Sequence, residues 1–119
     1  MNGDVRQVQP DDPEVAEEWQ RETNEPELRA VAACRVDEMG GWLVSVSVME
    51  FVRSEPLESE LRHSIGNALR GVNGAVRVEE DDHEQWFVAG TPSGRALVEA
   101  AALVVDEMAN QTRAYVDRF

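Results

Sequence analysis

The stretch LRAVAACRVDEMGGWLVSVSVMEF, residues 28–51, decides the fold. Its two halves, 28–37 and 42–51, alternate β-branched or apolar residues with small or polar ones, which is typical of β-strands. Gly40 and Gly41 lie between the halves, and paired glycines indicate a tight turn. The sequence therefore predicts an antiparallel hairpin.

Two registers are open for this hairpin. A two-residue turn at Gly40 and Gly41 would set Arg35 and Asp37 opposite valines and would put charge on the apolar face. We expect a three-residue loop instead, because it keeps one face apolar. The pairs are then Val36 with Val44, Cys34 with Val46 and Ala32 with Val48.

The rest of the chain predicts a helix, a second hairpin and a second helix. The first helix starts at Ser54-Glu55-Pro56, and its apolar residues recur every three or four positions at Leu57, Leu61, Ile65, Leu69 and Val72. The second hairpin pairs Val78 with Trp86 and Val76 with Val88 around a loop at 81–83. Thr91-Pro92 then opens a helix that runs from Ser93 nearly to Phe119.

The order strand, strand, helix, strand, strand, helix places the chain in the α+β class. Five of these elements match a ferredoxin-like plait, so we expect a ββαββα plait with an N-terminal edge strand. The expected sheet has four strands, is rich in antiparallel pairs and has the order first, second, fourth, third. Both helices cover one face, and parallel neighbours lie at the sheet centre.

The stretch ALRGVNGAVRVEED, residues 68–81, resembles the helix exit and second strand of heavy-metal-associated domains, which have the ferredoxin-like fold. The resemblance implies the fold alone. That family binds metal through a Cys-x-x-Cys pair before its first helix, and the corresponding residues here, 53–56, include no cysteine. We therefore expect neither a metal-chaperone function nor a cofactor.

Composition excludes several classes of protein. The chain has 24 acidic residues against 11 basic ones, all of them arginine, and a net charge of −13. Such a surface repels nucleic acid and anionic membranes. The single cysteine, Cys34, allows no intrachain disulfide. With no apolar run of membrane-spanning length and no secretory signal pattern, we expect a cytoplasmic protein.

Residues 1–27 carry nine of the acids and few apolar side chains. We expect this segment to be a disordered acidic tail before a single α+β domain at 28–119, because it cannot offset the entropy of ordering. Val15 and Trp19 leave open a short acidic helix in the tail that docks on a partner or on the chain's own domain.

The chosen registers assign the side chains of the sheet to two faces. We expect the helices to cover Cys34, Val44, Val46, Val48, Val76, Val78, Trp86 and Val88. The other face then carries Arg29, Val31, Ala33, Arg35, Leu43, Ser45, Ser47, Met49, Phe51, Arg77, Glu79, Gln85, Phe87 and Ala89. A second copy, a protein partner, or a small anion held by Arg35 and Arg77 would explain this composition, and a merely solvated face is the alternative.

The last helix also suggests an interface. About 26 residues at ~1.5 Å each make it longer than the strands, so its last turns extend past the sheet. There they fold back, dimerise, clasp a partner, fray or pack on the Gly40-Gly41 hairpin. We expect a noncatalytic protein-binding or assembly module, a homodimer or a partner-binding domain. Its interface residues are Arg35, Leu43, Ser45, Ser47, Met49, Phe51, Phe87, Tyr115 and Phe119. The alternative is a small cofactor-free dimeric plait enzyme or a small-ligand-binding protein, although the sequence identifies no catalytic residues.

Two further patterns have ordinary structural explanations. Thr91, Ser93 and Gly94 form a helix start that could hold an anion, but capping accounts for them. Oxygen ligands gather in the second hairpin at Glu80, Asp81, Asp82 and Glu84. Their spacing matches no calcium loop, so we expect a solvated turn and not a metal site.

Overall fold

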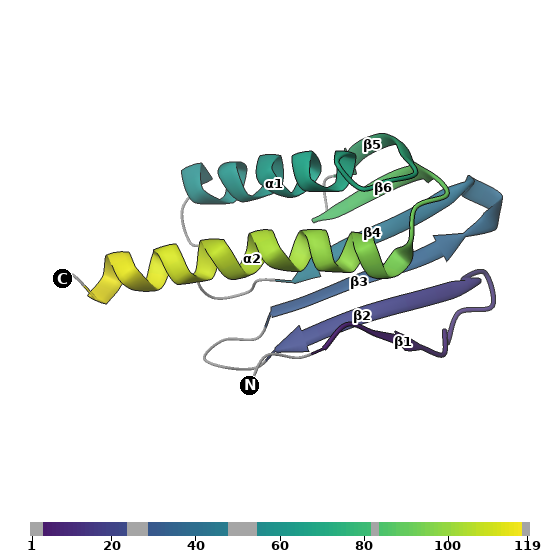
Figure 1. Cartoon of the computed structure of the whole chain (residues 1–119), viewed down its shortest axis with the longest axis horizontal. Coiled ribbons are helices and arrows are strands. Elements are labelled where there is room, and N and C mark those ends of the chain that lie inside the picture. Colours follow the sequence, from purple (N-terminus) through teal and green to yellow (C-terminus); the bar gives the residue numbers. More distant parts are fainter. Residues whose placement is uncertain (1–3, 24–28, 48–54, 82–83, 118–119) are drawn as a thin grey trace.

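Figure 1 shows the computed structural model of the chain, which describes residues 4–23, 29–47, 55–81 and 84–117, with the backbone alone at 55–57 and 111–117. Within these residues the protein is α+β. The strands are β1 (Arg6–Val8), β2 (Glu17–Thr23), β3 (Arg29–Val36), β4 (Gly41–Ser47), β5 (Ala75–Asp81) and β6 (Gln85–Gly90). A short 3-10 turn (Asp37–Met39) follows β3, and the helices are α1 (Glu55–Arg70) and α2 (Gly94–Asp117).

The described strands form one sheet in the order β1-β2-β3-β4-β6-β5, and every neighbouring pair is antiparallel. Both helices lie in a single layer on one side of this sheet (Figure 1). α2 packs over β2, β3 and β4, and α1 packs beside α2 and against β5. The expected α+β class is confirmed, but the sheet has six described strands where we expected four.

The expected parallel neighbours at the sheet centre are wrong. β4 and β6 are adjacent and antiparallel, because β6 returns from β5 in a hairpin and so runs opposite to it. α1 carries the chain back along the sheet, so β5 has the same direction as β4, and β6 lies between them.

The N-terminal segment differs from the disordered tail that we expected for residues 1–27. Within it, Arg6–Val8 and Glu17–Thr23 form β1 and β2. The expected short helix is absent from the described part of this segment: Asp12 accepts a hydrogen bond from the Glu14 amide in a turn, and Trp19 lies in β2. The alternation of Trp19, Arg21 and Thr23 with acidic or amide residues is the strand signal that the high charge obscured.

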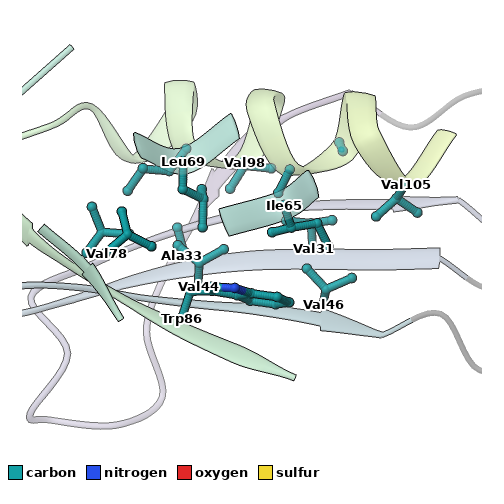
Figure 2. Close-up of a cluster of buried hydrophobic side chains, with 14 of the residues drawn as sticks. Val31, Ala33, Val44, Val46, Ile65, Leu69, Val78, Trp86, Val98 and Val105 are labelled. Carbon is teal, nitrogen blue, oxygen red and sulfur yellow. The ribbon is translucent and has the colours of Figure 1, made fainter. Parts of the chain in front are cut away.

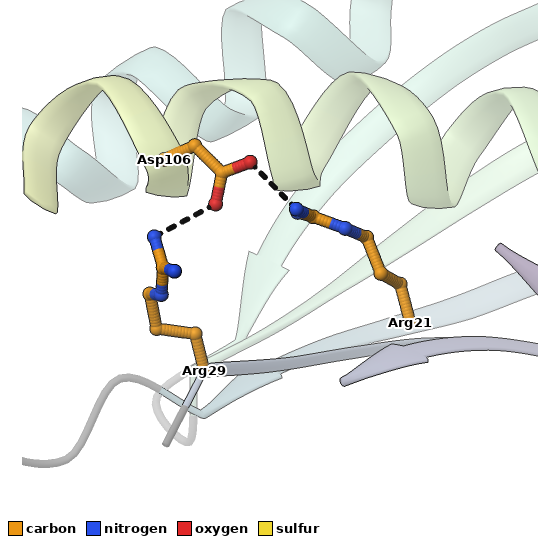
Figure 3. Close-up of polar contacts among 3 residues, drawn as sticks. All are labelled: Arg21, Arg29 and Asp106. Atoms are coloured by element: carbon orange, nitrogen blue, oxygen red, sulfur yellow. Dashed lines mark hydrogen bonds and ion pairs between the residues drawn. The ribbon is translucent and has the colours of Figure 1, made fainter. Parts of the chain in front are cut away.

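A shared carboxylate joins β2 and β3 to α2 (Figure 3). Asp106 of α2 accepts Arg21 Nη2 at 2.8 Å on one oxygen and Arg29 Nη1 at 2.9 Å on the other. The side chains of Arg21 and Arg29 are only 12% and 7% exposed, and that of Asp106 is 24% exposed. Largely desolvated arginines need a fixed counter-charge, so this cluster explains how a highly charged strand is held under a helix.

The register of the first hairpin is also different from the expected one. Val31 pairs with Val46 and Ala33 with Val44, so four residues, 37–40, connect the strands in place of three. Because of this shift, each side chain of β3 lies on the side of the sheet opposite to the one we expected. Val31 and Ala33 are buried under the helices, and Cys34 lies on the other face. Arg29 and Arg35, expected on the open side, share the helix side with Val31.

The second hairpin keeps the expected faces with one exception. Val78 pairs with Val88, and Glu80 pairs with Trp86, a shift of two residues that leaves Val78, Trp86 and Val88 buried. Val76, expected in the core, is 82% exposed because the pairing is irregular between Ala75 and Arg77.

One hydrophobic core lies between the helix layer and the sheet (Figure 2). From α1, Leu61, Ile65 and Leu69 are buried, as the helical spacing predicted. From α2 the core takes Leu97, Val98, Ala101, Ala102, Val105, Met108 and Ala109. The sheet contributes Val31, Ala33, Trp42, Val44, Val46, Val78, Trp86 and Val88.

We predict that Asp106→Asn lowers the free energy of unfolding by on the order of 3 kcal/mol, because two largely buried guanidinium groups lose their counter-charge. Urea unfolding followed by circular dichroism measures the change. Glu107→Gln is the matched control: Glu107 is the next residue of α2, is exposed, and should cost less than about 0.5 kcal/mol. Equal stability of the two variants would show that the cluster contributes nothing.

Candidate functional site

The sheet side opposite the helices is the candidate functional surface. Its centre consists of the residues of β3, β4 and β6 that point away from the core, which the pairing register places on one side. Eleven described positions share this side, and two of them at the turn, Val36 and Gly41, are buried. We call the other nine the open face: Ala30, Ala32, Cys34, Leu43, Ser45, Ser47, Gln85, Phe87 and Ala89. None of them is fully buried, and no described helix packs on them.

Four of the predicted interface residues lie on the open face: Leu43, Ser45, Ser47 and Phe87. The prediction for Arg35 is wrong, because the register of β3 puts it on the helix side. Met49, Phe51 and Phe119 lie outside the described residues, and for Tyr115 the description covers only its backbone in α2.

Sequence reasoning missed Ala30, Ala32 and Cys34 as members of the open face. Both sides of β3 carry apolar or small residues, Val31 and Ala33 on one side and Ala32 and Cys34 on the other. Either pair could fit a core, so the sequence pattern does not decide which side is buried. The larger volume of Val31 compared with Ala30 and Ala32 was the only local signal for the correct side.

Charge is excluded from the open face and gathers on either side of it. All nine positions are uncharged, although 29% of the chain is charged. On one flank the same side of the sheet continues over β2 and β1 with Glu18, Gln20, Glu22 and Arg6. On the other flank β5 presents Arg77, Glu79 and Asp81, and Arg77 pairs with Glu79 at 2.9 Å. An uncharged strip between charged margins resembles the centre and rim of a protein interface.

The last turns of α2 extend past the sheet, as the sequence predicted (Figure 1). The helix has 24 residues, which corresponds to about 36 Å, against about 23 Å for a strand of seven residues. Backbone at this end of the helix therefore lies beyond the ends of the described strands.

Cys34 lies on the open face beside Glu18, its cross-strand neighbour in β2. Burial raises the pKa of the Cys34 thiol from 9.0 to about 11, and the charge of Glu18, a hydrogen bond to Glu18 and the charge of Asp12 add to the shift. We expected this thiol in the core, which is wrong, but the raised pKa agrees with an unreactive cysteine.

The predicted anion-binding residues have separate structural roles. Ser93 Oγ accepts a hydrogen bond from the Ala96 amide at 3.3 Å and so caps α2. Gly94 is buried so tightly that a Cβ there would overlap the indole rings of Trp42 and Trp19. Thr91 is exposed and donates its amide to the Gly74 carbonyl. The helix start is thus covered by aromatic rings and is not an open anion site.

The acidic hairpin gives little support to a cation site. Glu80 lies 3.7 Å from the guanidinium of Arg62, and Asp82 is outside the described residues. Glu84 adopts a positive φ of 58° as part of the turn. Within the described ranges, no three His, Cys, Asp or Glu side chains are grouped as metal ligands.

We predict that thiol reagents label Cys34 slowly at pH 8, about a hundredfold more slowly than a cysteine with a pKa of 9.0, because the thiolate fraction falls by two powers of ten. The labelling rate should rise until about pH 11.

The same shift affects the stability of the fold. Because the pKa is raised in the folded state, the protonated thiol favours folding below pH 9, and this contribution disappears between about pH 9 and 11.

Glu18→Gln should speed labelling, since it removes the neighbouring negative charge, and Glu22→Gln, further along β2, is the matched control. The measurement uses dilute protein, so that self-association does not protect the thiol. Rapid labelling of the native chain at neutral pH would contradict the raised pKa and would support the enzyme alternative.

Within the described residues, neither helix combines the length and apolarity needed to span a membrane. Comparison of the chain with protein-family models, with curated proteins and with solved structures gives no match in any of the three.

Proposed function

We propose that the protein is a noncatalytic assembly module whose open face binds the open face of a second copy. The single observation that carries this proposal is the absence of charge from nine adjacent positions in a chain that has a net charge of −13. A solvated sheet face of an acidic protein gains nothing from excluding charge, whereas an interface must desolvate every group that it covers.

The size of the face supports a second copy as the occupant. Strands spaced about 4.8 Å apart and about 23 Å long give a six-stranded sheet a side of roughly 600 Å². Two such sides in contact bury roughly 1,200 Å², the lower limit of stable protein interfaces.

The charged flanks are compatible with two-fold symmetry. Each flank carries one arginine among acidic residues, Arg6 beside Glu18 and Glu22 on one side and Arg77 beside Glu79 and Asp81 on the other. A two-fold axis parallel to the strands superposes the β5 flank of one copy on the β2 flank of the other. By the pairing register Asp81 then lies level with Arg6, and Arg77, which pairs with Glu79, lies within two residues of the level of Glu18. The same contacts occur twice.

Fold and location belong to the same proposal. The order of β3, β4, β6 and β5 with α1 and α2 on one side supports a ferredoxin-like plait to which β1 and β2 are added. Acidic composition and a free cysteine support a cytoplasmic protein. The enzyme alternative has less support, because Cys34 has a raised pKa and His63 is exposed on α1.

We predict that Ser45→Arg abolishes self-association and leaves the fold intact, because it places a charge in the middle of the open face, between Ala32 and Gln85. Light scattering of the full chain over a hundredfold concentration range measures the mass, and circular dichroism checks the fold. Ser59→Arg adds the same side chain at an exposed position of α1 and should dimerise like the native chain. A native chain that stays monomeric throughout would refute the proposal.

Dimerisation should also strengthen as salt rises from 0.1 to 1 M. Two copies repel each other through net charges of −13, and the Debye length falls from about 10 Å to about 3 Å over this range. Sedimentation equilibrium at each salt concentration gives the dissociation constant. Dissociation at high salt would mean that ion pairs, and not the uncharged face, hold the copies together.

A further inference from the structure

A cavity of about 340 Å³ lies at the end of the sheet where the β3–β4 turn, the end of β6 and the approach to α2 meet. It is on the helix side of the sheet, away from the open face, because Arg35 and Trp42 in its lining both belong to that side. Its volume is within the range of small-molecule sites.

Charges of both signs line this cavity. Arg35 lies beside its cross-strand partner Glu17 and contacts Asp37 through Nε at 3.2 Å. Its side chain is 43% exposed, and within the described residues its terminal nitrogens make no further hydrogen bond or ion pair. A guanidinium with both terminal nitrogens available binds a carboxylate through two parallel hydrogen bonds.

The carboxylates of Glu17 and Asp37 can bind a positively charged group. Glu17 accepts a hydrogen bond from Trp19 Nε1 at 3.0 Å through one oxygen, which orients its carboxylate. Asp37 is 74% exposed, and its Oδ1 lies 3.2 Å from Arg35 Nε. Carboxylate oxygens on either side of a guanidinium can accept hydrogen bonds from an ammonium group placed next to a bound carboxylate.

The remaining lining is apolar or consists of tightly packed backbone. Trp42 and Pro92 are both buried and form an apolar surface. Gly41 and Gly90 approach neighbouring backbone so closely that a Cβ at either would overlap the carbonyl oxygen of Val88 or Gly74. These walls cannot be filled by side chains, so the cavity is built into the turn.

We propose that this cavity binds a free α-amino acid with an apolar side chain. The carboxylate of the ligand pairs with Arg35, its ammonium group with Glu17 and Asp37, and its side chain contacts Trp42 and Pro92. The lining offers a partner to both charges of a zwitterion, whereas a simple cation leaves the guanidinium of Arg35 without a ligand partner and a simple anion leaves both carboxylates without one.

The test titrates the full chain with three compounds of one carbon skeleton, followed by the backbone amide resonances of Gly40, Gly41 and Gly90 and the indole resonance of Trp42. L-Leucine carries both charges, 4-methylpentanoate lacks the amine, and 3-methylbutylamine lacks the carboxylate. We expect leucine to shift these resonances and to bind at least tenfold more tightly than either analogue. Equal binding of an analogue, or no shift with leucine up to its solubility limit, would overturn the proposal.

Variants separate this site from the open face. Arg35→Gln and Glu17→Gln should each weaken leucine binding at least tenfold, whereas Arg62→Gln on α1 should not change it. Ser45→Arg should bind leucine normally, so this proposal and the proposed self-association can fail independently. Unchanged leucine binding in Arg35→Gln would place the ligand elsewhere and refute the assignment.

Discussion

The turn between β3 and β4 is the constraint on which the rest of the structure depends. Its four residues, 37–40, end in Gly40 with a φ of 71°, a conformation that most side chains disfavour, and the Gly40 amide donates to the Asp37 carbonyl. Gly41 then passes too close to β6 for any side chain. This geometry sets Val31 opposite Val46. Because strand side chains alternate, it also decides the side on which every residue of β3 lies.

The N-terminal strands join the sheet as a consequence of this register. With β3 in this orientation, Arg29 lies on the helix side next to Arg21 of β2, and Asp106 of α2 reaches both. Burying a carboxylate with two arginines costs free energy of desolvation, and removing one of the three charged groups costs more, because it leaves a buried charge without its counter-charge. The cluster therefore couples β2, β3 and α2, and a segment with an apparently disordered composition becomes part of the sheet.

The open face and the cavity both result from the side of the sheet on which each residue of β3 lies. The register leaves Ala30, Ala32 and Cys34 on the open face, where they complete an uncharged surface with β4 and β6. It also brings Arg35 to the helix side, where the turn, β6 and the approach to α2 form the cavity. An assembly surface and a ligand cavity on opposite sides of one sheet can act without competing, because no residue of the open face lines the cavity.

The sequence by itself determined the α+β class, both helices, the presence of the β3–β4 and β5–β6 hairpins, and the buried stripe of Leu61, Ile65 and Leu69. Each of these depends on local periodicity and turn residues. It also identified Leu43, Ser45, Ser47 and Phe87 as outward residues, since the alternation in β4 and β6 has one apolar solution. Only the tertiary structure decided the side of β3, the addition of β1 and β2 and the meeting of Glu17, Arg35 and Asp37. Each of these depends on contacts between residues that are distant in the sequence. By local pattern alone, Val31 and Ala33 are no better suited to a core than Ala32 and Cys34. Nothing near Arg21 or Arg29 in the sequence indicates that Asp106 neutralises their charges.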